Sequence, residues 1–330
     1  MLPIMLTPPA DLSVQTLRMV LHAHWGIDAD VIDYRPVGFG SHHWSADSRW
    51  FLTIDELDLR RASRDDSTAA AFARLTAALG AASALRDNGF DFVVAPEPDR
   101  DGAPAVRFSE RFALACYPQL AGESFDFGDY RDEAHRRAVL DMLVAMHTDP
   151  RPIPARTDDF VIAHRDELEL TLADERVPDR GPYATATGEL LHANAIALRR
   201  AIDRYDALVA AARTAPAAMV LTHGEPHPAN TMRTDDGWRL IDWDTALIAP
   251  PERDLWDLDP GDGSLFAAYA DATGTRPRPD LLELYQCRWD LTDLAEYVHR
   301  FRCPHTGSQD DAKSWEELRG LVATLAEGRS

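Results

Sequence analysis

The stretch 220–232, VLTHGEPHPANTM, combines side chains that phosphoryl transfer uses. His223, Glu225 and Asn230 are spaced as histidine, any residue, acid, four residues and asparagine, which is the spacing of a kinase catalytic loop. Twelve residues after Asn230, Asp242 follows an apolar run that is expected to be a strand. An amide oxygen and a carboxylate are hard ligands that suit Mg²⁺. We therefore expect Glu225 to orient an attacking hydroxyl, and Asn230 and Asp242 to bind Mg²⁺.

His223 is a second candidate catalytic residue, although a histidine at this place more often supports the loop than acts as an acid or base. Gly38 and Gly40 lie between two β-rich runs, where glycine allows the backbone to approach phosphates closely. The alternative for these glycines is a plain hairpin turn. We expect Ser41 or His42 to contact the phosphates, because adjacent side chains in a strand point to opposite faces and so disfavour a metal site at the two neighbouring histidines.

The elements that would position these residues change in character along the chain. Residues 1–120 predict a sheet with one or two helices, at 11–24 and 67–86, whereas residues 121–330 predict mainly helices. The helical part includes a long stretch over 183–213 and helices from residue 264 to the end, with a hairpin in between. A length of 330 residues is also large for one core. The sequence therefore predicts an α+β protein with two lobes, 1–120 and 121–330.

Composition restricts the partners and the compartment. The net charge of −21 and the pI near 4.9 disfavour binding to nucleic acid or anionic membranes. The same charge favours a cationic small molecule, although acidity that only maintains solubility explains it equally well. Three scattered cysteines favour a reducing cytoplasm, and we find neither a signal peptide nor an apolar run of about 18 residues. Composition does not choose between a monomer and a homodimer.

Two long motifs resemble a known family, the aminoglycoside phosphotransferases, and most closely its spectinomycin phosphotransferase branch. They are THGEPHPAN together with LIDWDTALIAPPERDLWDL, and YQCRWDLTDLAEYV nearer the C-terminus. The resemblance implies a two-lobed, protein-kinase-like fold that uses Mg²⁺ and ATP or GTP to phosphorylate a hydroxyl of an aminocyclitol-type compound. It places Glu225 at the position of the catalytic aspartate, and Asp254 as the anchor of the catalytic loop. It also implies an interlobe hinge at CYPQL, where Tyr117 and Leu120 would meet adenine.

The chain departs from the family pattern at the base, which is glutamate, and at the strand lysine, where Thr53 stands. Lys313 is the only lysine, so we expect an arginine, Arg74, to supply the charge for the phosphates. These departures keep a rival open: a kinase-fold binding protein that has lost catalysis. A second rival is a kinase of an uncharged sugar or amino alcohol.

Three carboxylates near the C-terminus are candidates for the acceptor site. Asp290, Asp293 and Glu296 form a stripe on a predicted helix, opposite an apolar side that includes Trp289. Such a stripe is usually a solvated face. The resemblance implies the alternative that it faces the cleft and receives the ammonium groups of an acceptor.

Overall fold

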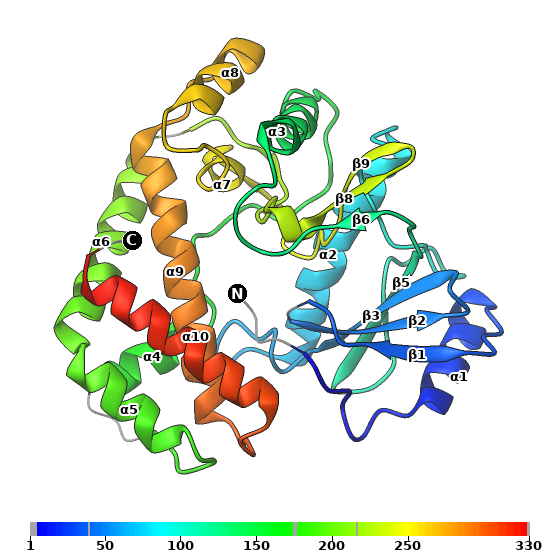
Figure 1. Ribbon diagram of the computed structural model, residues 1–330, viewed down its shortest axis with the longest axis horizontal. Helices are drawn as coiled ribbons and strands as arrows, with labels where there is room; N and C mark the ends of the chain where they lie inside the picture. Colours follow the sequence, from blue (N-terminus) through cyan, green and yellow to red (C-terminus); the bar gives the residue numbers. More distant parts are fainter. Residues whose placement is uncertain (1–4, 39, 174–176, 216, 329–330) are drawn as a thin grey trace.

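The chain folds into a sheet-rich lobe and a larger, mainly helical lobe (Figure 1). The computed structural model describes residues 5–38, 40–173, 177–215 and 217–328. The arrangement is the α+β class that the sequence predicts.

Five antiparallel strands form the sheet of the first lobe, in the order β1-β2-β3-β5-β4. Their bounds are β1 Ile32–Arg35, β2 Ser41–Ala46, β3 Trp50–Glu56, β4 Val106–Arg107 and β5 Phe112–Pro118. Ser41 lies opposite Asp55, and Thr53 lies opposite Ala115. Because side chains alternate along a strand, these four residues share one face of the sheet, which we call the cleft face.

A helix covers each face of this sheet. Helix α1 (Val14–Trp25) packs on the far face, where Trp44 and Leu52 are buried. Helix α2 (Thr68–Asp87) packs Leu75 and Leu79 against the alanines of β5 on the cleft face. Helix α2 therefore covers only part of the cleft face. Ser41 and Asp55, on the uncovered part, form hydrogen bonds with each other and with Arg60.

Helix α2 is long and rich in alanine. Among the described helices, it alone has the length and apolarity of a membrane-crossing segment, with a mean hydropathy of 1.3 over its most apolar window. Its small residues explain this composition. Ala78 and Ala82 pack against the core of the helical lobe, while Leu75 and Leu79 pack against the sheet, so the helix is apolar on two sides.

The second lobe contains short strands and helices around two apolar cores. The strands are β6 Glu123–Ser124, β7 Val220–Thr222, β8 Thr231–Thr234, β9 Gly237–Leu240 and β10 Leu247–Ala249. The helices are α3 Glu133–His147, α4 Arg165–Leu172, α5 Ala184–Ala193, α6 Ala195–Thr214, α7 Glu252–Leu255, α8 Ser264–Thr273, α9 Pro279–Arg302 and α10 Gln309–Ala326. Helices α4, α6 and α10 all pack against α9, which runs through the middle of this lobe (Figure 1).

The structure divides some elements differently from the sequence prediction. The expected long helix over 183–213 is two helices, α5 and α6, separated at Asn194, whose φ of −113° is not helical. Helix α4 was not expected. The β-rich run 91–99 forms only an isolated bridge, between Val93 and Leu240, which places it beside the strand that leads to Asp242.

Candidate functional site

The loop that carries the predicted catalytic residues is anchored by one buried carboxylate. The Asp254 side chain accepts hydrogen bonds from the backbone N–H of His223, at 2.9 Å, and of Gly224, at 2.6 Å. The same carboxylate lies 3.1 Å from His147 Nε2. The expected anchoring role of Asp254 is confirmed, and the loop is held from within the protein.

The sequence left two roles open for His223, as a catalytic acid or base or as a support of the loop, and the structure shows contacts of the supporting kind. Its Nε2 donates to the carbonyl oxygen of Ile241 at 2.8 Å, and its Nδ1 accepts from the backbone N–H of Glu225 at 3.1 Å. The side chain is fully buried. Because backbone groups occupy both ring nitrogens, His223 fixes the distance between the catalytic loop and the segment that carries Asp242.

Gly224 is required where the loop turns. Its φ is +103°, and a Cβ at this position would collide with the Arg253 guanidinium. We expect Gly224→Ala to destabilise the protein by at least about 2 kcal/mol more than Gly237→Ala, because overpacking adds to backbone strain. Gly237 is a matched control, since its φ is +111° but the nearest atom to its Cβ would be 3.8 Å away. Urea unfolding measures both values, and equal losses would contradict the account of Gly224.

Asn230 and Asp242 lie on two backbone segments that are joined directly. The backbone N–H of Ile241 donates to the carbonyl oxygen of Asn230 at 2.9 Å. The Asn230 side-chain NH₂ donates to the Glu225 carbonyl at 2.9 Å, which leaves its amide oxygen on the opposite side. Asp242 is in the left-handed region, at φ +65°, two residues after β9 ends, and its side chain is exposed. The two predicted metal ligands are thus fixed on adjoining segments.

Five carboxylates gather around this point, and we call them the carboxylate cluster: Asp55, Glu225, Asp242, Asp244 and Glu296. Arg60 is the described arginine within ion-pair distance of the cluster. Its Nε lies 2.6 Å from Asp55 Oδ1, and its Nη2 lies 2.5 Å from Asp244 Oδ2. One guanidinium faces five carboxylates, so the cluster has a large excess of negative charge.

The excess charge raises the affinity of these carboxylates for protons. Burial, followed by repulsion from Asp244, raises the pKa of Glu225 to about 7. The pKa of Asp242 is raised well above its ordinary value by the surrounding cleft, which displaces bulk water although the residue stays accessible, and by the neighbouring Asp244 and Glu225. Such an arrangement favours a cation, because a nearby positive charge relieves the repulsion among the carboxylates.

The glycine loop adjoins the cleft face. Gly38 and Gly40 both have a φ of +76°. A Cβ on Gly38 would lie 2.9 Å from the His43 ring, whose Nδ1 lies 2.7 Å from the Val37 carbonyl oxygen. His43 therefore supports the loop and requires a glycine at position 38.

The side chains of Ser41 and His42 lie on opposite faces of the sheet. The Ser41 hydroxyl donates to Asp55 at 2.7 Å and accepts from Arg60 at 3.2 Å, so Ser41 belongs to the network around the cluster. His42 is on the far face of the sheet, only 4% exposed, with its Nε2 3.0 Å from Glu56. The expected phosphate contact of His42 is therefore wrong for a structural reason, since strand alternation turns its side chain away from the cleft face.

Arg74 is not placed at the carboxylate cluster. Its guanidinium pairs with Asp66 and donates to the Arg60 carbonyl oxygen. It thus supports the loop between β3 and α2, residues 57–67, while the charge at the cluster comes from Arg60 in that loop.

The two hinge candidates lie at the end of β5. Tyr117 is on the cleft face of the sheet, the face that also carries Thr53. Leu120 is half-buried and follows β5 by two residues. Their contact with adenine stays a prediction.

The acidic stripe of α9 is not a solvated face. Asp290, Asp293 and Glu296 are all half-buried. Burial raises the pKa of Asp290 to about 6 and also raises that of Glu296, which lies near Arg60 and Asp244. At least the Glu296 end of the stripe therefore faces the cluster.

An aromatic pocket opens beside Glu225. Phe127, Trp256 and Trp289 line it together with Glu225 and Asp257. The Phe127 and Trp289 rings are nearly parallel, with centroids 6.2 Å apart. The sequence assigned Trp289 only to the apolar side of α9, and the structure places it in this pocket. A larger cavity of about 440 Å³ lies between the 57–67 loop, α4 and α6, and contains no residue of the carboxylate cluster.

Comparison with known proteins decides the family. The model of the phosphotransferase enzyme family matches residues 39–297, which is most of the chain. Protein StrN of Streptomyces griseus is 32% identical over 250 residues, covering 71% of this chain and 72% of StrN. The chain belongs to the phosphotransferase enzyme family.

The fold of this phosphotransferase agrees with solved structures. The crystal structure of spectinomycin phosphotransferase APH(9)-Ia, in complex with ADP and spectinomycin, has a TM-score of 0.69 at 17% identity, covering 97% of this chain and 99% of that one. Macrolide 2'-phosphotransferase MphH from Brachybacterium faecium has a TM-score of 0.53 at 20% identity, covering 94% and 98%. At these identities the likeness shows the kinase-like fold alone.

The structure adds several residues to the candidate site that the sequence did not indicate. The sequence prediction placed the cation on the strand or on the following helix, whereas Arg60 is in the loop between them, four residues after β3. Asp244 was visible in the motif IDWD, two residues after Asp242. Trp256 was equally visible in the motif DLWDL, but nothing in the sequence shows that it meets Trp289.

Proposed function

We propose that this phosphotransferase transfers the γ-phosphate of ATP to a hydroxyl of a cationic, aminocyclitol-type compound. The observation that carries the proposal is the placement of Glu225, Asn230 and Asp242 on adjoining segments, held by Asp254. Phosphoryl transfer depends on positioning and charge stabilisation more than on covalent chemistry of the protein. A rigid loop that carries a carboxylate beside a cation-binding cluster meets both needs.

The residues present fit Mg²⁺. Asn230 offers an amide oxygen, and Asp242 offers an accessible carboxylate in a cluster whose five carboxylates face one guanidinium. Both are hard oxygen donors, and Mg²⁺ is commonly held by one or two carboxylates and the substrate phosphates. When bound, the metal would neutralise charge that develops on the phosphates. Asn230 and Asp242 would hold it.

Glu225 would orient the acceptor hydroxyl. Its side chain is about one-third exposed, 34%, and lines the aromatic pocket. The loop beyond it is fixed, because the Tyr130 hydroxyl donates to the Pro226 carbonyl at 2.8 Å. A carboxylate with a pKa raised to about 7 by burial is poised to accept a proton near neutral pH.

Arg60 would take the place of the missing strand lysine. It reaches the cleft face from the 57–67 loop, where it is 12% exposed and bonds Ser41 beside the glycine loop. A guanidinium suits phosphate oxygens because it presents several donors in a fixed plane. Support for an adenine nucleotide comes from the ADP complex of APH(9)-Ia.

The acceptor pocket favours a cation. Aromatic faces and carboxylates together attract ammonium groups, and this pocket combines Phe127, Trp256 and Trp289 with Asp257 and Glu225. The net charge of −21 adds long-range attraction. The spectinomycin complex of APH(9)-Ia supports an acceptor of this class over an uncharged sugar.

The test is turnover with a panel of acceptors. Spectinomycin, streptomycin, choline and an uncharged sugar are supplied with ATP and Mg²⁺, and both ADP release and phosphorylated product are measured. We expect product with at least one cationic acceptor and none with the sugar. Product with the sugar alone would contradict the proposed acceptor class. Absence of product with every acceptor would contradict the proposed transfer to compounds of this kind.

Glu225→Gln should lower kcat by about 10²–10⁴-fold, since it removes the proton acceptor. Nucleotide affinity should be retained. Glu225→Asp is the matched control, because it keeps the carboxylate and moves it by roughly 1 Å, for which a smaller loss of about 10²-fold or less is expected. Unchanged kcat in Glu225→Gln would remove this residue from the reaction.

A further inference from the structure

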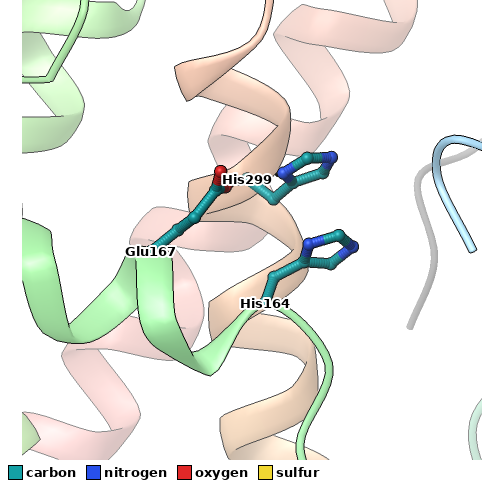
Figure 2. Close-up of side chains that lie close together, drawn as sticks. All are labelled: His164, Glu167 and His299. Atoms are coloured by element: carbon teal, nitrogen blue, oxygen red, sulfur yellow. Dashed lines mark hydrogen bonds and ion pairs between the residues drawn. The ribbon is translucent and has the colours of Figure 1, made fainter. Parts of the chain in front are cut away.

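A second group of metal-binding side chains lies outside the carboxylate cluster, where α4 meets α9. His164 and Glu167 are one helical turn apart at the start of α4, and His299 faces them from α9 (Figure 2). One ligand atom from each residue lies within 4.8 Å of the others. His164 and Glu167 are buried, and the His299 side chain is 16% exposed. Three groups that commonly bind metals thus share one enclosed space.

Glu167 and His299 form a close pair. The carboxylate Oε2 lies 2.6 Å from His299 Nδ1. The two imidazole rings are stacked, with centroids 3.7 Å apart and planes within 9° of each other (Figure 2). An ion pair between a protonated His299 and Glu167 explains these two residues but does not explain His164.

His164 has a buried nitrogen without a hydrogen-bond partner. Its Nε2 faces the carbonyl oxygen of Leu59 at 3.5 Å, so Nε2 carries the proton and Nδ1 carries the lone pair. This Nδ1 is buried, and the structure gives it no partner among the described residues. A buried acceptor without a partner is costly. A histidine whose other nitrogen donates to a carbonyl oxygen is the usual arrangement of a metal ligand.

The backbone of His164 adds a second unusual feature. Its φ is +57°, in the left-handed region that few residues other than glycine adopt, although histidine does so more often than most. This conformation caps α4 at its N-terminus, although the His164 side chain makes no capping hydrogen bond. The strain is therefore not offset by a cap, and the ring is instead directed to the space beside Glu167 and His299.

We propose that His164, Glu167 and His299 bind one divalent transition-metal ion of the Zn²⁺ type, through the two Nδ1 atoms and the Glu167 carboxylate. Two imidazoles and one carboxylate suit Zn²⁺ and disfavour Mg²⁺, which prefers oxygen ligands. Ligand distances of about 2.0–2.2 Å in a tetrahedral site place neighbouring ligand atoms roughly 3.3 Å apart. Glu167 Oε2 and His299 Nδ1, which lie 2.6 Å apart, must therefore separate, and the stacked rings must turn so that the two Nδ1 lone pairs converge on the ion. Any proton on His299 Nδ1 leaves to solvent when the metal binds, and the fourth position is left for water.

The site would stabilise the loop that holds Arg60. His164 contacts this loop on both sides of Arg60, since its Nε2 faces the Leu59 carbonyl and its backbone N–H donates to the Ala62 carbonyl at 2.9 Å. A metal that fixes the His164 ring between α4 and α9 would therefore fix the 57–67 loop as well. This consequence rests on the proposed role of Arg60, whereas metal binding itself does not.

The test is direct metal binding by the full chain after treatment with a chelator. Zn²⁺ retained after dialysis is measured by elemental analysis, and Co²⁺ binding by its visible absorption. We expect about one equivalent in the wild type. His164→Asn, which tolerates a positive φ, and His299→Gln should each bind at least about 10-fold more weakly.

A matched control separates this site from a surface histidine. His22 Nδ1 also lies 2.6 Å from a carboxylate, that of Asp28, but both side chains are exposed and no third ligand is near enough to form a described cluster. His22→Asn should therefore retain the wild-type affinity. Circular dichroism verifies that each variant is folded. Wild-type protein that binds no Zn²⁺ or Co²⁺, or folded His164→Asn and His299→Gln variants that bind as tightly as the wild type, would overturn the proposal.

Discussion

Asp242→Asn is expected to lower the rate of phosphoryl transfer by about 10³-fold or more, because it removes the charged metal ligand while nearly preserving the shape of the side chain. Asparagine tolerates the left-handed conformation at φ +65°, so the backbone should be undisturbed. Steady-state release of ADP in the presence of the best acceptor measures the effect. The fall should be in kcat as well as in kcat/KM.

The Asp242→Asn substitution should not destabilise the protein, although it lowers the rate of phosphoryl transfer. Asp242 is surrounded by Asp244 and Glu225, which raise its pKa, so neutralising it should leave the melting temperature unchanged or raise it when no metal is present. Asp235→Asn is the control, since Asp235 is exposed in the turn between β8 and β9 and is outside the carboxylate cluster. Full turnover in a folded Asp242→Asn variant would show that this carboxylate is not a metal ligand.

Arg60→Met is expected to lower the free energy of unfolding by about 3–5 kcal/mol, because it leaves the Asp55 carboxylate buried without its cation. Asp55 is 3% exposed at its side chain and 2.6 Å from Arg60 Nε. Urea unfolding measures the loss. Arg64→Ala is the control in the same loop. Arg64 pairs with Asp166, but their side chains are 50% and 36% exposed, so this ion pair should contribute less than about 1 kcal/mol to the free energy of unfolding.

A double variant separates stability from activity. Asp55→Asn in the Arg60→Met background removes the unpaired charge, and the amide retains a partner in Ser41, so most of the lost stability should return. Turnover should stay low, because no described arginine other than Arg60 is within ion-pair distance of the carboxylate cluster. Recovery of both properties would contradict the role of Arg60 at the phosphates.

The proximity of Glu225, Asn230 and Asp242 could be predicted from the sequence because these residues are close along the chain. His223, Glu225 and Asn230 lie within eight residues, and Asp242 follows on the next hairpin. The short spacing along the chain therefore determines most of the arrangement of these side chains. The anchoring by Asp254 was also predictable, although it came from the resemblance to the family and not from the spacing.

The cation at the site could not be predicted because its position depends on a loop. Arg60 and Arg74 are equivalent candidates by composition, and only the fold shows that Arg74 pairs with Asp66 while Arg60 reaches Asp55. The predicted phosphate contact of His42 was wrong for a simpler reason. Its face of the strand follows from the register between β2 and β3, and the sequence does not specify which of two adjacent histidines faces the cleft.

The aromatic pocket, which we propose as the acceptor site, could not be predicted as a whole because it depends on long-range contacts. The acidic stripe of α9 was found by its helical spacing, but a solvated face was equally consistent with it. Phe127, Trp256 and Trp289 come from three separate segments, and no local pattern shows that they meet. Binding sites of this kind become visible only after the helices are packed.

The most direct test of the central claim is calorimetric titration of ATP into the wild type and into Asp242→Asn, each with and without Mg²⁺. The account predicts binding by the wild type that is strengthened by Mg²⁺, and a loss of that metal dependence in the variant. Nucleotide binding that is absent under all conditions, or that responds to Mg²⁺ equally in both proteins, would contradict the assignment of Asp242 and the carboxylate cluster as the phosphotransferase site.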